Sequence, residues 1–263
     1  MMKLSRKQKL ALGVAIAVGV SAPVLAAHSW SNYHWKRTTA ELTVPVGDNV
    51  DSRWDPYLTK AVADWNQSAV INSPKVAGST NPKNCRAVAG TIQACNSTYG
   101  NNGWLGLASI SLSGGHITQG TTKLNDTYFN MAQYNTPAWR ATVTCQEIGH
   151  DYGLGHQDEN SSTDTTTSCM DYTNVPAGNE SPDAHDYQQL LAIYNHTETG
   201  LMIGSGRGNS GVDVGDTPAE WGRAIHFMKD GRPDVFERID GPGQKTITHV
   251  FWAIGEGPRG RTK

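Results

Sequence analysis

One stretch constrains this chain more than any other: it reads QEIGHDYGLGH and begins at Gln146. On an α-helix, Gln146 and His150 project from the same face one turn apart, and Glu147 lies at the rim of that face. Gly153 can adopt the positive φ that ends a helix, so the chain can turn and bring His156 back toward the helix. The spacing predicts Gln146, His150 and His156 as ligands of one metal, because a catalytic zinc keeps three protein ligands and one open position.

Glu147 is predicted to be the catalytic base. A bound metal lowers the pKa of a water toward about 7, and a neighbouring carboxylate can take the proton of that water and pass it to a leaving amine. A glutamate on a helix is more often a solvated surface residue, but the adjacent candidate ligands reverse that expectation. His116, Asp158 and His185 are further potential ligands, and we expect them to be ordinary because none has motif spacing.

The pattern resembles the metzincin zinc metallopeptidases, in which an extended zinc helix is followed by a turn that carries methionine beneath the metal. Here the sequence SCMDY follows the helix and supplies Met170 and Tyr172. Most metzincins have histidine in the position of Gln146, whereas the gametolysin branch is similar in carrying Q-E-x-x-H. An amide oxygen is neutral and less basic than imidazole, so Gln146 predicts weaker metal binding than histidine would give.

The resemblance implies an α+β fold: a twisted mixed β-sheet with an active-site helix, a core helix and a C-terminal helix, followed by a small β-rich extension. It also implies Zn²⁺ as the cofactor, Met170 as an apolar floor, and Tyr172 as a catalytic residue that contacts the metal or steadies the oxyanion. Plain packing is the alternative for Tyr172. The implied function is a zinc-dependent endopeptidase with a matrixin-like catalytic domain.

Two other functions compete with the endopeptidase. The first is a catalytically silent metzincin fold that serves as a binding protein and has lost a zinc ligand at Gln146. The second is a carbohydrate-binding protein, suggested by eight tryptophans, although tryptophans are more often core or cleft residues.

The N-terminus predicts a signal peptide over residues 1–27. Four basic residues precede an uncharged apolar stretch, and the segment closes with PVLAA. The apolar stretch is short for a membrane span, which needs about 20 residues, so an uncleaved anchor is the less favoured alternative. We therefore expect a secreted protein, extracellular or periplasmic, without stable membrane association after the signal is removed.

Four cysteines remain in the predicted mature chain: Cys85, Cys95, Cys145 and Cys169. An even number in an exported protein favours disulfides over buried free thiols. Of the three possible connectivities, sequence proximity favours Cys85–Cys95 and Cys145–Cys169. The second bridge would fasten the methionine turn to the zinc helix.

The charge balance bears on the partners of the protein. Removing the four basic residues of the signal segment leaves 22 − 4 = 18 basic against 24 acidic residues, a net charge of 18 − 24 = −6. No basic run occurs downstream, so nucleic acid is not an expected partner. We expect a protein or peptide substrate and a monomeric chain.

Apolar periodicity and turn residues predict the elements along the chain. The expected strands cover 40–46, 70–77, 104–112 and 116–124, with 47–49 ending the first of them. The expected helices begin at Asp55, at Thr136 and near 182, and the second should stop at Gly153. A glycine-rich linker over 204–216 and a hairpin of strands 234–239 and 246–254 should follow. These elements divide the chain into a signal peptide 1–27, a metzincin-like catalytic domain 28–200 and an extension 201–263.

Overall fold

The computed structural model describes residues 29, 31–158, 167–199, 211 and 213–258. The predicted signal peptide and most of the predicted linker therefore lie outside the described residues. Within the described part, no helix is long and apolar enough to cross a membrane.

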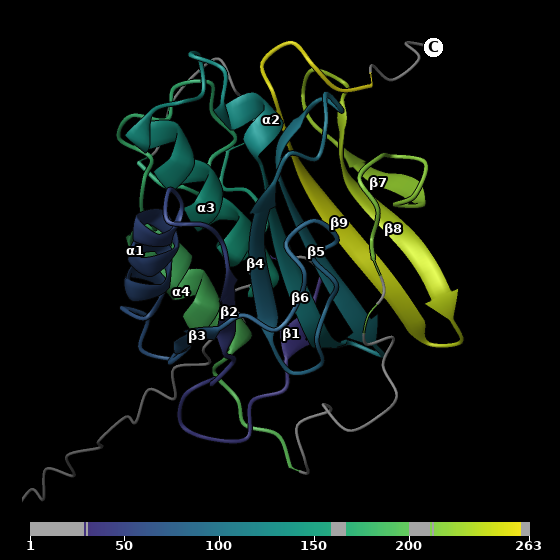
Figure 1. Cartoon of the computed structure of the whole chain (residues 1–263). Coiled ribbons are helices and arrows are strands. Elements are labelled where there is room, and N and C mark those ends of the chain that lie inside the picture. Colours follow the sequence, from purple (N-terminus) through teal and green to yellow (C-terminus); the bar gives the residue numbers. More distant parts are fainter. Residues whose placement is uncertain (1–28, 30, 159–166, 200–210, 212, 259–263) are drawn as a thin grey trace, which may run out of the picture.

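A single mixed β-sheet forms the centre of the molecule (Figure 1). Its strands follow one another in the order β3-β2-β4-β6-β5-β9-β8-β7, and β1 pairs with β6. Strands β1, β2, β3, β4 and β6 pair in parallel, whereas β5, β9, β8 and β7 pair antiparallel. The bounds are β1 His34–Trp35, β2 Val46–Asn49, β3 Lys75–Ala77, β4 Ile92–Ser97, β5 Trp104–Ser113, β6 His116–Asn125, β7 Arg223–Phe227, β8 Pro233–Gly241 and β9 Gln244–Trp252.

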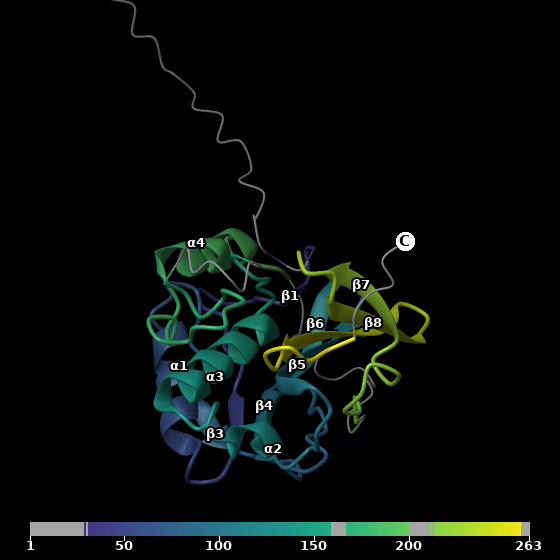
Figure 2. The same cartoon turned by 90° about the horizontal axis from the view of Figure 1, so that it is seen from above.

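Helices α1, α3 and α4 cover one face of the sheet (Figures 1 and 2). Helix α3 packs across β5 and β6 and also contacts α1 and β9. The helices are α1 Asp55–Trp65, α2 Asp126–Phe129, α3 Pro137–Asp151 and α4 Ala184–Ile193. The expected α+β class, with a mixed sheet and few helices, is confirmed.

The first predicted strand is displaced along the chain. Residues 47–49 were expected to end it, but they lie inside β2, and only an isolated bridge at Leu42 marks the expected position. Gly47 pairs with β3 and β4 as a strand residue, and glycine leaves room there because a Cβ would lie 2.6 Å from the side chain of Gln93 on β4. The strand predicted over 70–77 is shorter than expected and covers only Lys75–Ala77.

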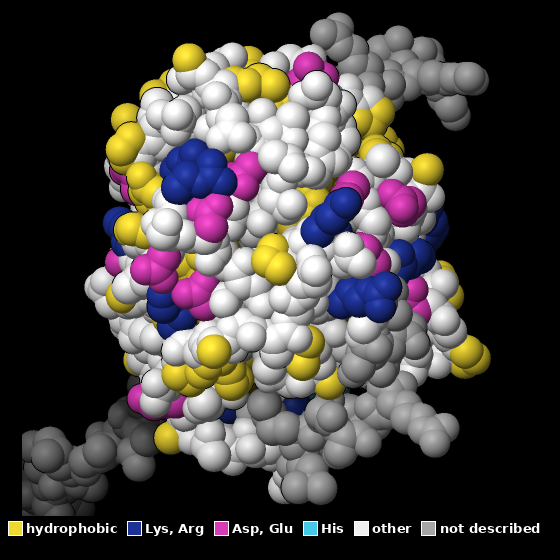
Figure 3. Space-filling view, in the orientation of Figure 1, with side chains coloured by type: hydrophobic (Ala, Val, Ile, Leu, Met, Phe, Trp, Pro, Cys, Tyr) yellow, Lys and Arg dark blue, Asp and Glu magenta, His cyan; other side chains and the backbone are white. Residues whose placement is uncertain are grey.

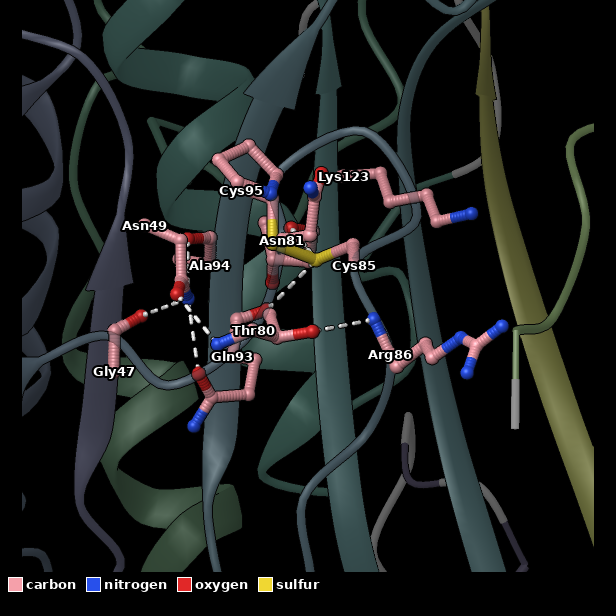
Figure 4. Close-up of a disulfide and its surroundings, with 12 residues drawn as sticks. Gly47, Asn49, Thr80, Asn81, Cys85, Arg86, Gln93, Ala94, Cys95 and Lys123 are labelled. Carbon is pink, nitrogen blue, oxygen red and sulfur yellow. Dashed lines mark hydrogen bonds between the residues drawn. A yellow bond between two sulfur atoms is a disulfide. The ribbon is translucent and has the colours of Figure 1, made fainter. Parts of the chain in front are cut away.

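Both predicted disulfides are present, Cys85–Cys95 and Cys145–Cys169. Figure 4 shows the first beside Asn49 and Gln93, where Asn49 Nδ2 donates a hydrogen bond of 2.9 Å to Gln93 Oε1. Strand β4 begins inside the segment that this bridge closes. Two disulfides are consistent with an extracellular protein.

Removing the second disulfide should lower stability measurably. The bridge closes a sequence separation of 24 residues. Loop-closure entropy then predicts that the double variant C145A/C169A loses about 3 kcal/mol in the free energy of unfolding. Urea unfolding of both proteins measures the loss, and unchanged stability would contradict the expected role of this bridge.

The predicted C-terminal hairpin is present as β8 and β9, and it joins the central sheet. Strand β9 runs antiparallel along β5 over most of its length, with Phe251 opposite Gly106 and His249 opposite Ala108. The division into a catalytic domain and an extension stays a prediction. In the described residues, the strands of both parts belong to one sheet, so β9 lies directly beside the strand that α3 covers.

Candidate metal centre

Helix α3 has the ends that the sequence predicts. The side chain of Thr136 accepts a hydrogen bond from the backbone N–H of Trp139 at 3.2 Å, and Pro137 opens the helix. At the other end Gly153 has φ +93°, and a Cβ there would lie 2.6 Å from the backbone oxygen of Tyr33. Glycine is therefore required for both the turn and the close approach, and the turn returns the chain toward the helix.

His150 and His156 meet as the motif predicts. Their Nε2 atoms lie 3.1 Å apart, close to the separation of about 3.3 Å expected for two imidazoles on a tetrahedral zinc. His150 Nδ1 lies 2.8 Å from the backbone oxygen of Leu154, which can only accept a hydrogen bond. Nδ1 must therefore donate, and in the neutral ring the lone pair is then on Nε2, facing His156.

A third histidine joins this pair from strand β9. One ring nitrogen each of His150, His156 and His249 lies within 4.8 Å of the others, and all three residues are buried. The ring centroids of His150 and His249 lie 3.9 Å apart. Burial, followed by the neighbouring His150, lowers the pKa of His249 well below its usual value, which favours the neutral imidazole that binds metals.

Asp234 on β8 lies behind this group. It is fully buried, and its Oδ1 lies 2.7 Å from Nδ1 of His226. Its Oδ2 lies 3.4 Å from Nδ1 of His156, which is longer than a well-formed hydrogen bond. Burial alone would raise the pKa of Asp234, but the contacts with His156 and His226 outweigh it and the pKa is lowered. A carboxylate behind a ligating imidazole fixes the ring and increases its basicity.

Replacing Asp234 with asparagine should therefore weaken metal binding without deleting a ligand. Loss of such a supporting carboxylate typically costs about 10–100-fold in metal affinity. Zinc titration against a competing chelator measures the loss. Asp240→Asn is a matched control on the same strand, because Asp240 contacts Arg238 and Thr246 instead. Equal affinities of Asp234→Asn and the parent would contradict the orienting role.

Gln146 contacts the methionine turn. Its Nε2 donates hydrogen bonds of 2.7 Å to the backbone oxygens of Cys169 and Asp171. Its Oε1 is buried and has no hydrogen-bond partner among the described residues. The role of Gln146 as a metal ligand stays a prediction. The contacts themselves show that this amide holds the turn against the helix beside the Cys145–Cys169 bridge.

Glu147 lies between α3 and strand β5. A Cβ on Gly106 would lie 2.6 Å from Glu147 Oε1, so the glycine leaves room for the carboxyl group. Glu147 is fully buried, and neither oxygen has a hydrogen-bond partner among the described residues. Burial, with a smaller effect from the charge of Asp151, raises its pKa well above the usual value. A carboxyl group of this kind is poised to hold a proton.

The raised pKa of Glu147 has a consequence for the metal-free protein. Because the folded state binds this proton more tightly than the unfolded state, the stabilising effect is complete below the usual pKa of 4.5 and is lost as the pH rises. Glu147→Gln stays neutral, so the variant should gain stability relative to the parent as the pH is raised from about 5 to about 8. Urea unfolding in the presence of a chelator measures both, and parallel pH profiles would contradict the prediction.

Met170 and Tyr172 are buried beside the centre. A Cβ on Gly149 would lie 2.5 Å from the sulfur of Met170, so this glycine lets the turn approach α3. The ring of Tyr172 lies 5.6 Å from that of His156. The Tyr172 hydroxyl donates to the backbone oxygen of Trp252 at 3.2 Å and accepts from its N–H at 2.9 Å. In this structure Tyr172 therefore fastens β9 to the turn, and its catalytic role stays a prediction.

The remaining candidate ligands lie outside the three-histidine group. Asp158 pairs with Lys229 at 3.4 Å, His185 lies on α4 beside Gln189, and His116 contacts Glu198. On the face of the molecule in Figure 3, no histidine side chain of the described residues is visible, and basic and acidic side chains are interspersed.

Comparisons with known proteins add little to this geometry. No family model matches the sequence, and no curated protein matches it. Among solved structures, the chain is similar to High choriolytic enzyme 1 (HCE-1), a hatching enzyme zinc-protease from Oryzias latipes (Medaka fish). The identity is 14%, the TM-score is 0.34, and the match covers 62% of this chain and 94% of that chain. At this level of similarity, function has to be inferred from the residues of this chain.

Proposed function

We propose that the protein is a zinc-dependent endopeptidase in which His150, His156 and His249 hold the metal and Glu147 is the general base. The observation that carries the proposal is the arrangement of the first two histidines. Their Nε2 atoms face each other at 3.1 Å, the Nδ1 of His150 has a backbone acceptor behind it, and the Nδ1 of His156 lies 3.4 Å from Asp234 Oδ2. His249 then supplies the third imidazole from β9.

The donor set fits zinc. Three neutral imidazoles are typical ligands of a catalytic zinc, and they leave one position for water or substrate. When bound, the metal would supply a positive charge that acidifies a water and polarises a peptide carbonyl. The orphaned Gln146 Oε1 and Glu147 carboxyl are the kind of buried polar atoms that a cation or water would satisfy.

Glu147 would move the proton. Its carboxyl has no competing hydrogen bond among the described residues, so it can accept one from the attacking water. A nearby dication favours the ionised carboxylate and offsets the burial that otherwise keeps the group protonated. The proton then passes from Glu147 to the nitrogen of the leaving amine, which completes hydrolysis.

A second candidate function has burial in its favour. The exposed fractions of Glu147, His150, His249 and His156 are 0%, 1%, 3% and 8%, so the centre is closed to a peptide in this conformation. A metal held there could simply fasten β9 to α3 in a catalytically silent binding protein. Such a protein would bind zinc and be stabilised by it, but it would not cleave a peptide bond.

One assay separates the two functions. The full chain, purified in zinc-containing buffer, is analysed for metal and incubated with unfolded casein, with and without 1,10-phenanthroline. The endopeptidase proposal requires bound zinc and cleavage that the chelator abolishes and added zinc restores. Bound zinc without cleavage would favour the silent binding protein. Absence of zinc from the purified chain would contradict both.

A further inference from the structure

A second group of potential metal ligands lies apart from α3. His34 on β1, His116 at the start of β6, and Glu198 after α4 each place one ligand atom within 4.8 Å of the others. We propose that these three residues, with His196 beside them, form a separate site for a divalent transition cation such as Zn²⁺. This proposal does not depend on peptidase activity, because none of its residues belongs to the α3 centre.

Backbone pairing holds the three segments together. Strand β1 pairs in parallel with β6, which places His34 directly opposite His116. The N–H of Glu198 donates to the backbone oxygen of Arg37 at 2.8 Å, and the N–H of Trp35 donates to the hydroxyl of Tyr194 at 3.2 Å. Figure 2 shows β1 between α4 and β6. The candidate ligands therefore lie on three segments that are far apart in sequence and that backbone hydrogen bonds hold together.

His34 is the strongest indication of a ligand site. Its Nδ1 lies 2.7 Å from the backbone oxygen of Asn32, which can only accept, so Nδ1 donates and the lone pair of the neutral ring is on Nε2. That Nε2 atom is buried and has no hydrogen-bond partner among the described residues. It lies 3.8 Å from Glu198 Oε1. A cation bound here would accept the buried lone pair of His34 Nε2 and pair with the neighbouring carboxylate of Glu198.

The other groups complete the coordination set. His116 Nε2 lies 2.8 and 3.0 Å from the two carboxylate oxygens of Glu198. The exposed ring of His196 lies 5.2 Å from that of His34, so it can turn to become a fourth ligand. Imidazoles with one carboxylate suit Zn²⁺ and similar ions, whereas Ca²⁺ and Mg²⁺ prefer oxygen ligands throughout.

Accessibility distinguishes this site from the α3 centre. The side chains of His34, Glu198 and His116 are 17%, 24% and 26% exposed, so a cation can reach them without displacement of a strand. A metal there would join β1 to β6 and to the segment after α4. We therefore expect a structural cation whose removal loosens these three segments.

Zinc binding to full-length variants tests the proposal. His249→Ala silences the α3 centre, so this variant should bind one zinc, and H249A/E198Q should bind it at least about 100-fold more weakly. H249A/H185A is the matched control and should behave as H249A does. Added zinc should raise the melting temperature of H249A and of the control, but not that of H249A/E198Q.

The parent and Glu198→Gln alone provide a second comparison that does not rely on the folding of H249A. Glu198→Gln should hold one zinc fewer than the parent, whether or not the α3 centre is loaded. Equal zinc content in these two proteins would overturn the proposal. So would an equal zinc affinity of H249A and H249A/E198Q. The parent chain could fail to cleave casein while Glu198→Gln still holds one zinc fewer than the parent. That result would refute the proposed function and support this site.

Discussion

The variant His249→Ala is expected to lose the metal of the α3 centre and, with it, the chelator-sensitive cleavage of casein. His249 provides one of three imidazoles, and alanine replaces it with no donor. Zinc affinity at this centre should fall by at least about 100-fold, because removing a ligand costs more than removing a group behind one. Titration with a competing chelator measures the affinity, and the casein assay measures the activity.

Gln146→Ala is the informative comparison for His249→Ala. It removes the two hydrogen bonds to the methionine turn, but it leaves all three histidines in place. We expect it to bind zinc within about tenfold of the parent, the smaller cost associated with a supporting group. A loss of zinc affinity as large as that of His249→Ala would show that Gln146 is a ligand, as the helix motif predicts.

The activity of His249→Ala tests the position of β9. Higher activity of this variant than of the parent would show that β9 blocks the centre instead of completing it.

The second large effect is expected from Glu147→Gln. This change deletes the proton acceptor and no ligand, so zinc content should stay at the parent level. The turnover number should fall by about 10²–10⁴-fold, the usual contribution of a general base. Metal analysis and the rate of casein cleavage at saturating substrate separate the two quantities.

Glu41→Gln controls for the removal of a carboxylate. Glu41 accepts a hydrogen bond from Asn72 and has no part in the centre, so its variant should cleave casein at the parent rate. Full activity in Glu147→Gln would contradict the assignment of the base. Loss of zinc in the same variant would show that Glu147 holds the metal.

Local sequence was enough to predict one half of the candidate centre. The helix, its capping Thr136, the turn at Gly153 and the approach of His156 all follow from offsets of a few residues. The Cys145–Cys169 bridge could be predicted because four cysteines allow only three connectivities and sequence proximity favours this one. Apart from the bridge, each of these features depends on neighbours along the chain.

The other half depends on the pairing of β9 with β5, which the sequence did not reveal. His249 reaches the centre only because β9 pairs with β5. Asp234 follows through the predicted hairpin, because β8 pairs with β9. The pattern did contain one signal: Ile247, His249 and Phe251 alternate along a strand, so a histidine shares a face with two apolar residues. The pairing of His34 with His116 escaped prediction in the same way, because β1 is only two residues long.

The most direct test of the three-histidine centre is anomalous diffraction at the zinc absorption edge from crystals of the zinc-loaded full chain. We expect a peak between α3 and β9, about 2.0–2.1 Å from the Nε2 atoms of His150 and His156 and from a ring nitrogen of His249. A zinc-loaded crystal without a peak at this position, or with a peak bound by Gln146 in place of His249, would contradict the proposed centre.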